Sequence, residues 1–191
     1  MSTKPDILVV DDENRLADLY TEWLQQDGWS VETAYNGETA LERLTASIEI
    51  VLLDRRMPDQ TGEDVLETIR DGGYDARVVM ATAVDPDFDI IEMGFDDYLV
   101  KPISQTELLT AVDHVTQRAT YESDMQTYYT LVSKKALLES KKPASELDGN
   151  EEYQTLCTRV EELEEQTDAT VSSLRDHDEF VGVFRDISSE N

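Results

Sequence analysis

Six side chains that could do chemistry together stand at the ends of short apolar runs. They are three carboxylates, a hydroxyl, a phenol and an ammonium group: Asp11, Asp12, Asp54, Thr82, Tyr98 and Lys101. Short apolar runs separated by helix-compatible stretches are typical of buried parallel strands. Because parallel sheets place their functional groups at the carboxyl ends of the strands, we expect these residues to meet at one edge of one sheet.

Three carboxylates at one edge would repel one another unless a cation neutralised them. Oxygen-only ligation favours a hard divalent ion, and Mg2+ fits best because it accepts carboxylates together with water and phosphate. A carboxylate beside Mg2+, a lysine and a hydroxyl is suited to receiving a phosphoryl group. Asp54 is then the nucleophile, since Asp forms aspartyl-phosphates in covalent catalysis, and Asp11 and Asp12 hold the metal.

Each of these residues also has an ordinary structural interpretation. An Asp-Asp pair before a helix often only caps it, and Asp54 could belong to a turn with Pro58 and Gly62. Thr82 could be an ordinary cap at a strand end, and Tyr98 a core or rim residue. All of these interpretations would have to hold together to defeat the chemical one, which we therefore prefer.

Four segments resemble the receiver domain of two-component response regulators, in order and with the usual spacing. They are residues 7–13 (ILVVDDE), 52–58 (LLDRRMP), 80–83 (MATA) and 94–102 (GFDDYLVKP). The resemblance covers about the first 118 residues. It implies that a sensor histidine kinase phosphorylates Asp54. It also implies that Mg2+ binds Asp11, Asp12, Asp54 and the main-chain carbonyl of Arg56.

The same resemblance implies roles for the remaining site residues. Lys101 and Thr82 would bind the phosphoryl oxygens, with Thr82 moving toward them, while the ring of Tyr98 turns inward as a switch. The peptide bond between Lys101 and Pro102 would be cis, which only an X-Pro bond allows at low cost. The chain is not expected to be an enzyme beyond this: the receiver would promote only its own phosphotransfer and autodephosphorylation.

Apolar runs and helical stretches alternate through the first part of the chain. We expect strands near 6–10, 31–34, 50–54, 77–82 and 97–100, and helices near 13–27, 37–46, 62–70, 87–93 and 104–118. This alternation predicts an α/β fold with a parallel sheet covered on both faces. The resemblance implies a doubly wound, flavodoxin-like sheet of five strands in the order 2-1-3-4-5. We place the receiver domain at residues 1–119 and a second domain at 120–191.

Residues 120–191 are predicted to form an all-α hairpin with a small closing helix near 178–187. Residues 104–142 contain no Gly or Pro, so the last receiver helix could continue into this part. Residues 143–150 provide the first break. A heptad-like apolar stripe follows: Tyr153, Leu156, Val160, Leu163 and Thr167. The HalX domain, which accompanies receivers in haloarchaea, is resembled by segments 128–129, 133–139, 152–153 and 180–181 together with Leu156.

Two outputs of different classes fit this second domain. The first is a phosphorylation-gated interaction module that forms a self-dimer or binds a downstream protein partner. The alternative is a transcriptional regulator that binds DNA directly or through a partner. Nucleic-acid binding normally needs clustered Lys and Arg, and the second domain has one basic cluster: Lys134, Lys135, Lys141 and Lys142. We favour the interaction module, because such a cluster is most often a solvated face.

The chain carries 43 acidic residues against 16 Lys and Arg, a net charge of −27. Residues 1–119 hold 26 acidic and 9 basic groups, and residues 120–191 hold 17 and 7, so both parts are acidic. Such self-repulsion destabilises a compact chain and is screened within about 3 Å at 1 M salt. We interpret the composition as halophilic, the alternative being an acidic mesophilic protein. Thermal unfolding should therefore show stability rising with KCl, and a loss of stability would contradict the halophilic interpretation.

The sequence also bounds the location of the protein. No apolar stretch approaches 18 residues, and residues 1–5 have no signal-peptide pattern. We therefore expect a soluble, cytoplasmic protein with no membrane partner. Cys157 is the single cysteine, so an internal disulfide is impossible.

Overall fold

The computed structural model describes residues 6–83 and 88–188, with side chains described at 6–83 and 90–170. The chain divides into two compact units, Met1–Val115 and Thr116–Asn191. Helix α4 (Gln105–Lys141) contains both this division and the domain boundary predicted after residue 119. The first unit holds the candidate site, and the second is helical.

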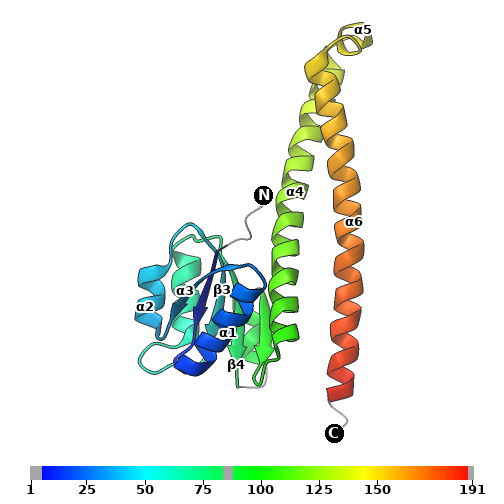
Figure 1. Ribbon diagram of the computed structural model, residues 1–191. Coiled ribbons are helices and arrows are strands. Elements are labelled where there is room, and N and C mark those ends of the chain that lie inside the picture. The colour runs from blue at the N-terminus through cyan, green and yellow to red at the C-terminus, as the bar shows by residue number, and fades with distance from the viewer. Residues whose placement is uncertain (1–5, 84–87, 189–191) are drawn as a thin grey trace. The chain divides into compact units, whose positions relative to one another are not determined.

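A five-stranded parallel sheet organises the first unit (Figure 1). Its strands are β1 (Asp6–Val10), β2 (Ser30–Ala34), β3 (Ile48–Asp54), β4 (Arg77–Thr82) and β5 (Asp97–Val100). Their order, β2-β1-β3-β4-β5, confirms the predicted α/β fold class. The three central strands are buried almost throughout because helices cover both of their faces.

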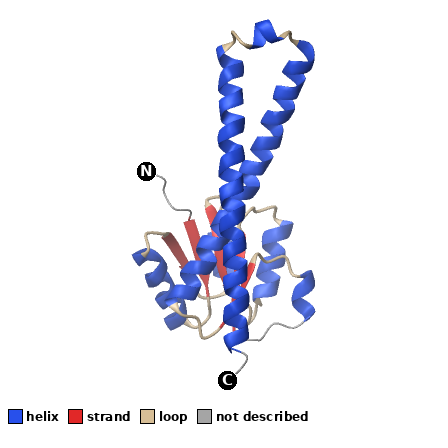
Figure 2. Cartoon of the chain, turned by 90° about the vertical axis from the view of Figure 1, so that its right-hand side faces the viewer, coloured by secondary structure: helices blue, strands red, loops and turns tan. Residues whose placement is uncertain are grey.

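Helices lie on both sides of the sheet (Figure 2), and alternate residues of each central strand enter different cores on its two sides. In β1, Ile7 and Val9 pack beneath α1 (Asn14–Gln26) and the first part of α4, against Tyr20 and Leu108 among others. Their neighbours Leu8 and Val10 pack on the opposite face. That face is covered by α2 (Gly37–Arg43) and α3 (Gly62–Asp71). The period of two along a strand produces this division.

The second unit is a helical hairpin made of the remainder of α4, the single-turn α5 (Ala144–Leu147) and α6 (Glu151–Ser188). Its seam follows the predicted stripe, with Val160, Leu163 and Thr167 buried. The Tyr153 hydroxyl donates a hydrogen bond of 2.7 Å to the Glu139 carboxylate, which fixes the register of the two arms. Although α4 and α6 are long, no described helix is apolar enough to span a membrane.

Three predicted helices differ from the structure. The closing helix expected near 178–187 is not separate, because α6 runs without a break to Ser188. Residues 151–181 contain no Gly or Pro that would end it. The helix expected at 37–46 ends at Arg43, where Leu44 becomes extended and enters the core. The helix expected near 87–93 is a 3-10 helix, η1 (Phe88–Glu92), while residues 84–87 lie outside the described residues.

Candidate functional site

The carboxyl ends of four strands bring the predicted residues to one edge of the sheet. Asp11 follows β1, and Asp54 and Thr82 are the last residues of β3 and β4. Lys101 follows β5, and its backbone N–H donates a hydrogen bond of 2.7 Å to the Thr82 carbonyl. The parallel register carries this alignment across the sheet, with Val10 beside Leu53 and Asp54 beside Ala81. The strand pattern read from the sequence is therefore sufficient to assemble this edge.

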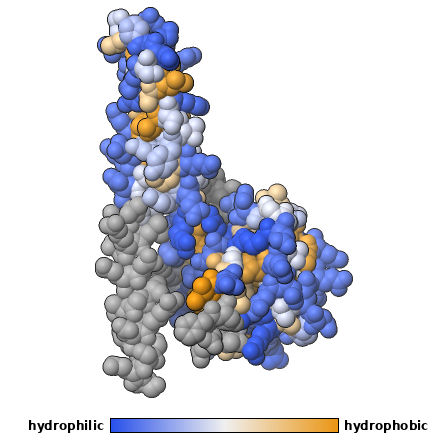
Figure 3. All heavy atoms as spheres, turned by 180° about the vertical axis from the view of Figure 1, so that it is seen from behind, coloured by the Kyte–Doolittle hydropathy of each residue, from blue (hydrophilic) through white to orange (hydrophobic). Residues whose placement is uncertain are grey.

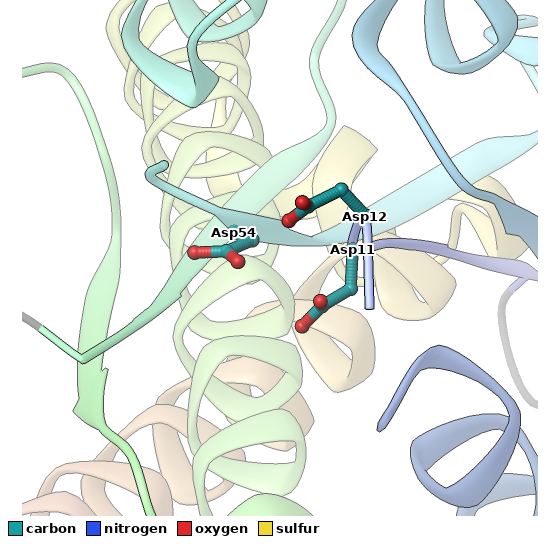
Figure 4. A group of neighbouring side chains, drawn as sticks. All are labelled: Asp11, Asp12 and Asp54. Atoms are coloured by element: carbon teal, nitrogen blue, oxygen red, sulfur yellow. The ribbon is translucent and has the colours of Figure 1, made fainter. Parts of the chain in front are cut away.

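Three carboxylates converge at this edge (Figure 4). One oxygen from each of Asp11, Asp12 and Asp54 lies within 4.8 Å of the others. Asp11 is 2% exposed and Asp54 is 6% exposed, whereas Asp12 is exposed. The Lys101 ammonium donates hydrogen bonds of 2.6 Å to Asp11 Oδ2 and 2.8 Å to Asp54 Oδ2. One ammonium thus bridges the two buried carboxylates.

The electrostatics of the site leave room for a further cation. Three carboxylates and one ammonium carry two net negative charges when all are ionised. Burial raises the pKa of Asp11 above its ordinary value, although the hydrogen bond and charge of Lys101 act in the opposite direction. Burial lowers the pKa of Lys101, but its hydrogen bonds to both carboxylates outweigh this and raise the pKa overall. One lysine shared by two buried carboxylates therefore does not fully compensate Asp11.

Backbone amides orient two of the carboxylates. Asp11 Oδ1 accepts a hydrogen bond of 2.9 Å from the Glu13 N–H, and Asp54 Oδ1 accepts one of 3.2 Å from the Arg56 N–H. The residue before α1 is Glu13, and its side chain makes no capping hydrogen bond. The helix-capping interpretation of the Asp11-Asp12 pair is therefore not realised. Asp11 and Asp54 are instead both held toward Lys101.

The loop after Asp54 contains a close approach that the sequence did not reveal. Gly62, the first residue of α3, donates a hydrogen bond of 2.9 Å from its N–H to the Arg55 carbonyl. A Cβ atom at Gly62 would lie 2.1 Å from the Asp54 carbonyl oxygen, so only glycine fits. The largely buried Arg55 side chain pairs with Glu63 at 2.7 Å. These contacts seat the Asp54 loop on the beginning of α3.

The remaining predicted residues lie around the same edge. Thr82 is fully buried, and Tyr98 is half-buried with its ring 5.4 Å from that of Phe95. The Arg56 side chain is exposed, while its main chain contacts Asp54. The peptide bond between Lys101 and Pro102 is cis.

A five-stranded sheet of this order, with acidic residues and a lysine at its carboxyl edge, defines a receiver-type fold. The response regulator receiver domain family matches residues 7–113, and the HalX domain family matches residues 117–184. The chain therefore belongs to the response regulator receiver family, and its receiver domain is followed by a HalX domain. Both resemblances read from the sequence are confirmed.

Curated relatives share this receiver in longer proteins. A putative transcriptional regulator of Haloferax volcanii is 47% identical over 165 residues, which cover 86% of this chain and 28% of that protein. The transcriptional regulatory protein CpxR of Escherichia coli K12 is 37% identical over 123 residues, covering 63% and 53%. The chain thus spans about half or less of the length of these relatives.

Solved receiver structures share the fold. The receiver domain of a putative Luxo repressor protein from Vibrio parahaemolyticus has 31% identity and a TM-score of 0.56, covering 63% of this chain and 95% of that one. The response regulator TrrA of Thermotoga maritima, in complex with Mg(2+)-BeF, has 34% identity and a TM-score of 0.51, covering 57% and 96%.

Proposed function

We propose that Asp54 is the phosphoacceptor of a two-component phosphorelay and controls the helical hairpin that follows. The observation that carries this proposal is the buried Asp54 carboxylate, held 2.8 Å from the Lys101 ammonium and beside two further carboxylates. A sensor histidine kinase would present phosphohistidine. An Asp54 oxygen would attack phosphorus, the phosphorus–nitrogen bond would break, and an aspartyl-phosphate would remain. Phosphoryl transfer to wild type and to Asp54→Asn tests this proposal.

The donor set fits Mg2+, because it consists of hard carboxylate oxygens with uncompensated negative charge. Asp11, Asp12, Asp54 and the main-chain carbonyl of Arg56 would hold the ion. When bound, it would neutralise charge on the transferring oxygens. Lys101 would exchange its hydrogen bond with Asp54 for one with the phosphoryl group. The buried Thr82 hydroxyl would donate a further hydrogen bond, and Tyr98 would follow as the switch.

The output we propose is protein interaction, with no enzymatic activity beyond the receiver's own phosphotransfer and autodephosphorylation. Helix α4 begins in the receiver and continues into the hairpin without a break, which provides a covalent route for the switch. Not all four lysines of the basic cluster are free to contact DNA. Lys135 is half-buried, and Lys142 pairs with Glu146 at 2.8 Å. Direct DNA contact remains the alternative output.

Mg2+ should stabilise the wild-type protein, because it relieves repulsion within the carboxylate cluster. At a concentration about 100 times its dissociation constant, a ligand of the native state adds about 2.7 kcal/mol. We expect the unfolding temperature in high KCl to rise by several degrees over a sample with EDTA. Asp12→Asn should remove most of this shift. Glu49→Gln, an exposed change in the same strand as Asp54, should retain it. Equal shifts in both variants would contradict the assignment.

The exposed Arg56 side chain should tune the lifetime of the aspartyl-phosphate. Its guanidinium can pair with phosphoryl oxygens and shield them, and an exposed pair contributes up to about 1 kcal/mol. Arg56→Ala should therefore speed hydrolysis about two- to fivefold without abolishing phosphorylation. A radiolabel chase measures this, with Arg159→Ala as a control because that arginine pairs with Glu162 in the hairpin. An unchanged decay rate in Arg56→Ala would show that Arg56 does not affect the lifetime of the aspartyl-phosphate.

A further inference from the structure

One stretch of α4 departs from the acidic character of the chain. Residues 125–138 contain no Asp or Glu, although the chain holds 43 of them among 191 residues. Lys134 and Lys135 lie within it and Lys141 and Lys142 follow it, so four of the six lysines lie in or just after the stretch. In an otherwise acidic chain, this loss of negative charge points to a surface that meets something other than water.

The same stretch exposes two large apolar side chains. Tyr129 is 62% exposed and Leu137 is 60% exposed, although both belong to the hairpin. The inner face of this arm is already used, because Tyr128, Val132 and Leu138 are half-buried. Figure 3 shows apolar side chains standing among polar ones on one face of the hairpin. The outward face of this arm therefore carries apolar area beyond what closes the hairpin.

The outward face is complementary to itself. Tyr129 and Leu137 lie two helical turns apart, with the small, exposed Ser133 midway between them. A two-fold axis at Ser133 would place Tyr129 of one chain against Leu137 of a second copy, and the reverse. The exposed Glu122 lies beyond one end of the face and the exposed Lys141 beyond the other. Antiparallel pairing would bring each near its opposite charge in the second copy.

We propose that the outward face of α4 between Glu122 and Lys141 is a self-association surface on which a second copy of this chain packs antiparallel. This inference rests on the proposed interaction output and names its partner. A second copy fits better than nucleic acid, because the exposed area is contributed by Tyr129 and Leu137. Apolar contacts of this kind persist at high salt, whereas exposed charge contacts are screened.

Disulfide trapping tests the arrangement directly. In the 191-residue chain carrying Cys157→Ser, the variant Ser133→Cys should form an intermolecular disulfide upon mild oxidation in high KCl. Thr155→Cys, an exposed position on α6, is the matched control and should form no intermolecular disulfide. Both variants are tested with and without acetyl phosphate and Mg2+. Trapping at residue 133 in either state supports the proposal, whereas no trapping in both states, or equal trapping at both positions, overturns it.

Sedimentation of the full chain supplies a second test. Leu137→Asp should weaken self-association about tenfold or more, whereas Ile91→Asp, at a 74% exposed position in the receiver, should not. At moderate salt, Lys141→Glu and Glu122→Lys should each weaken self-association, and the double variant should recover it. A monomer at all concentrations would overturn the proposal. Binding of duplex DNA that Leu137→Asp abolishes, without any self-association, would overturn it too.

Failure of this inference can be separated from failure of the proposed function. Labelling of Asp54 without self-association would remove the α4 surface alone. Self-association through Ser133 without labelling of Asp54 would instead leave the surface and remove the phosphoacceptor.

Discussion

Asp54→Asn is expected to abolish phosphoryl transfer from acetyl phosphate or a cognate kinase. Asn keeps the size of the side chain but lacks the anionic oxygen that attacks phosphorus. It also removes the charge that accepts a hydrogen bond of 2.8 Å from Lys101, which keeps its bond to Asp11. Phosphate-affinity electrophoresis and mass spectrometry of the intact protein measure the loss. We expect no labelled fraction in the variant under conditions that label the wild type.

Asp59→Asn is the matched control for this prediction. Asp59 lies in the loop after β3 with a φ of 67°, a conformation that Asn adopts about as readily as Asp. This variant therefore makes the same chemical change five residues away and should label normally. Labelling of Asp54→Asn at the same stoichiometry as wild type would reject Asp54 as the acceptor. Loss of labelling in both variants would show that the loop rather than the carboxylate had been tested.

Gly62→Ala is expected to have the largest effect on stability. The added Cβ would lie 2.1 Å from the Asp54 carbonyl oxygen and 2.9 Å from Arg55 Cα, and neither backbone atom can rotate away. The loop must therefore shift. We expect the free energy of unfolding to fall by at least about 1–3 kcal/mol. Phosphoryl transfer should fall as well, because the shift moves Asp54 relative to Lys101. Chemical denaturation measures the first effect and acetyl phosphate labelling the second.

The control for Gly62→Ala is Gly94→Ala in the same unit. The atoms nearest to a Cβ atom at Gly94 would belong to the Arg70 side chain, at 3.5 Å, which is ordinary van der Waals contact. We therefore expect that variant to retain both its stability and its labelling. Equal stability of the two variants would show that the close approach beneath Asp54 is relieved at no cost.

The strands and the site could be predicted from the sequence for one physical reason. Strands buried on both faces appear as apolar runs, and the polar residue that ends each run lies at the common edge of a parallel sheet. Asp54 and Lys101 meet for this reason, although they are far apart in the chain. Gly62 carried no such signal, because its constraint comes from the backbone of Asp54 and Arg55, against which the folded loop places it. The Arg55–Glu63 pair was missed for the same reason.

The sequence predicted the buried face of the hairpin better than it predicted where the hairpin helices end. Val160 and Leu163 recur with helical spacing, and that periodicity identifies the buried face. The continuation of α6 to Ser188 was missed, because the apolar residues Phe180, Phe184 and Ile187 favoured a separate closing helix near 178–187. A change in the apolar pattern does not end a helix when no capping or breaking residue accompanies it.

Amide hydrogen exchange across residues 117–184, before and after phosphorylation, tests the central claim most directly. The claim is that the phosphoryl group on Asp54 changes the state of the helical hairpin. With acetyl phosphate and Mg2+ in high KCl, exchange in the hairpin should change in wild type and remain unchanged in Asp54→Asn. Identical exchange in labelled and unlabelled wild-type protein would contradict the claim, because the receiver would then carry its phosphoryl group without controlling the hairpin.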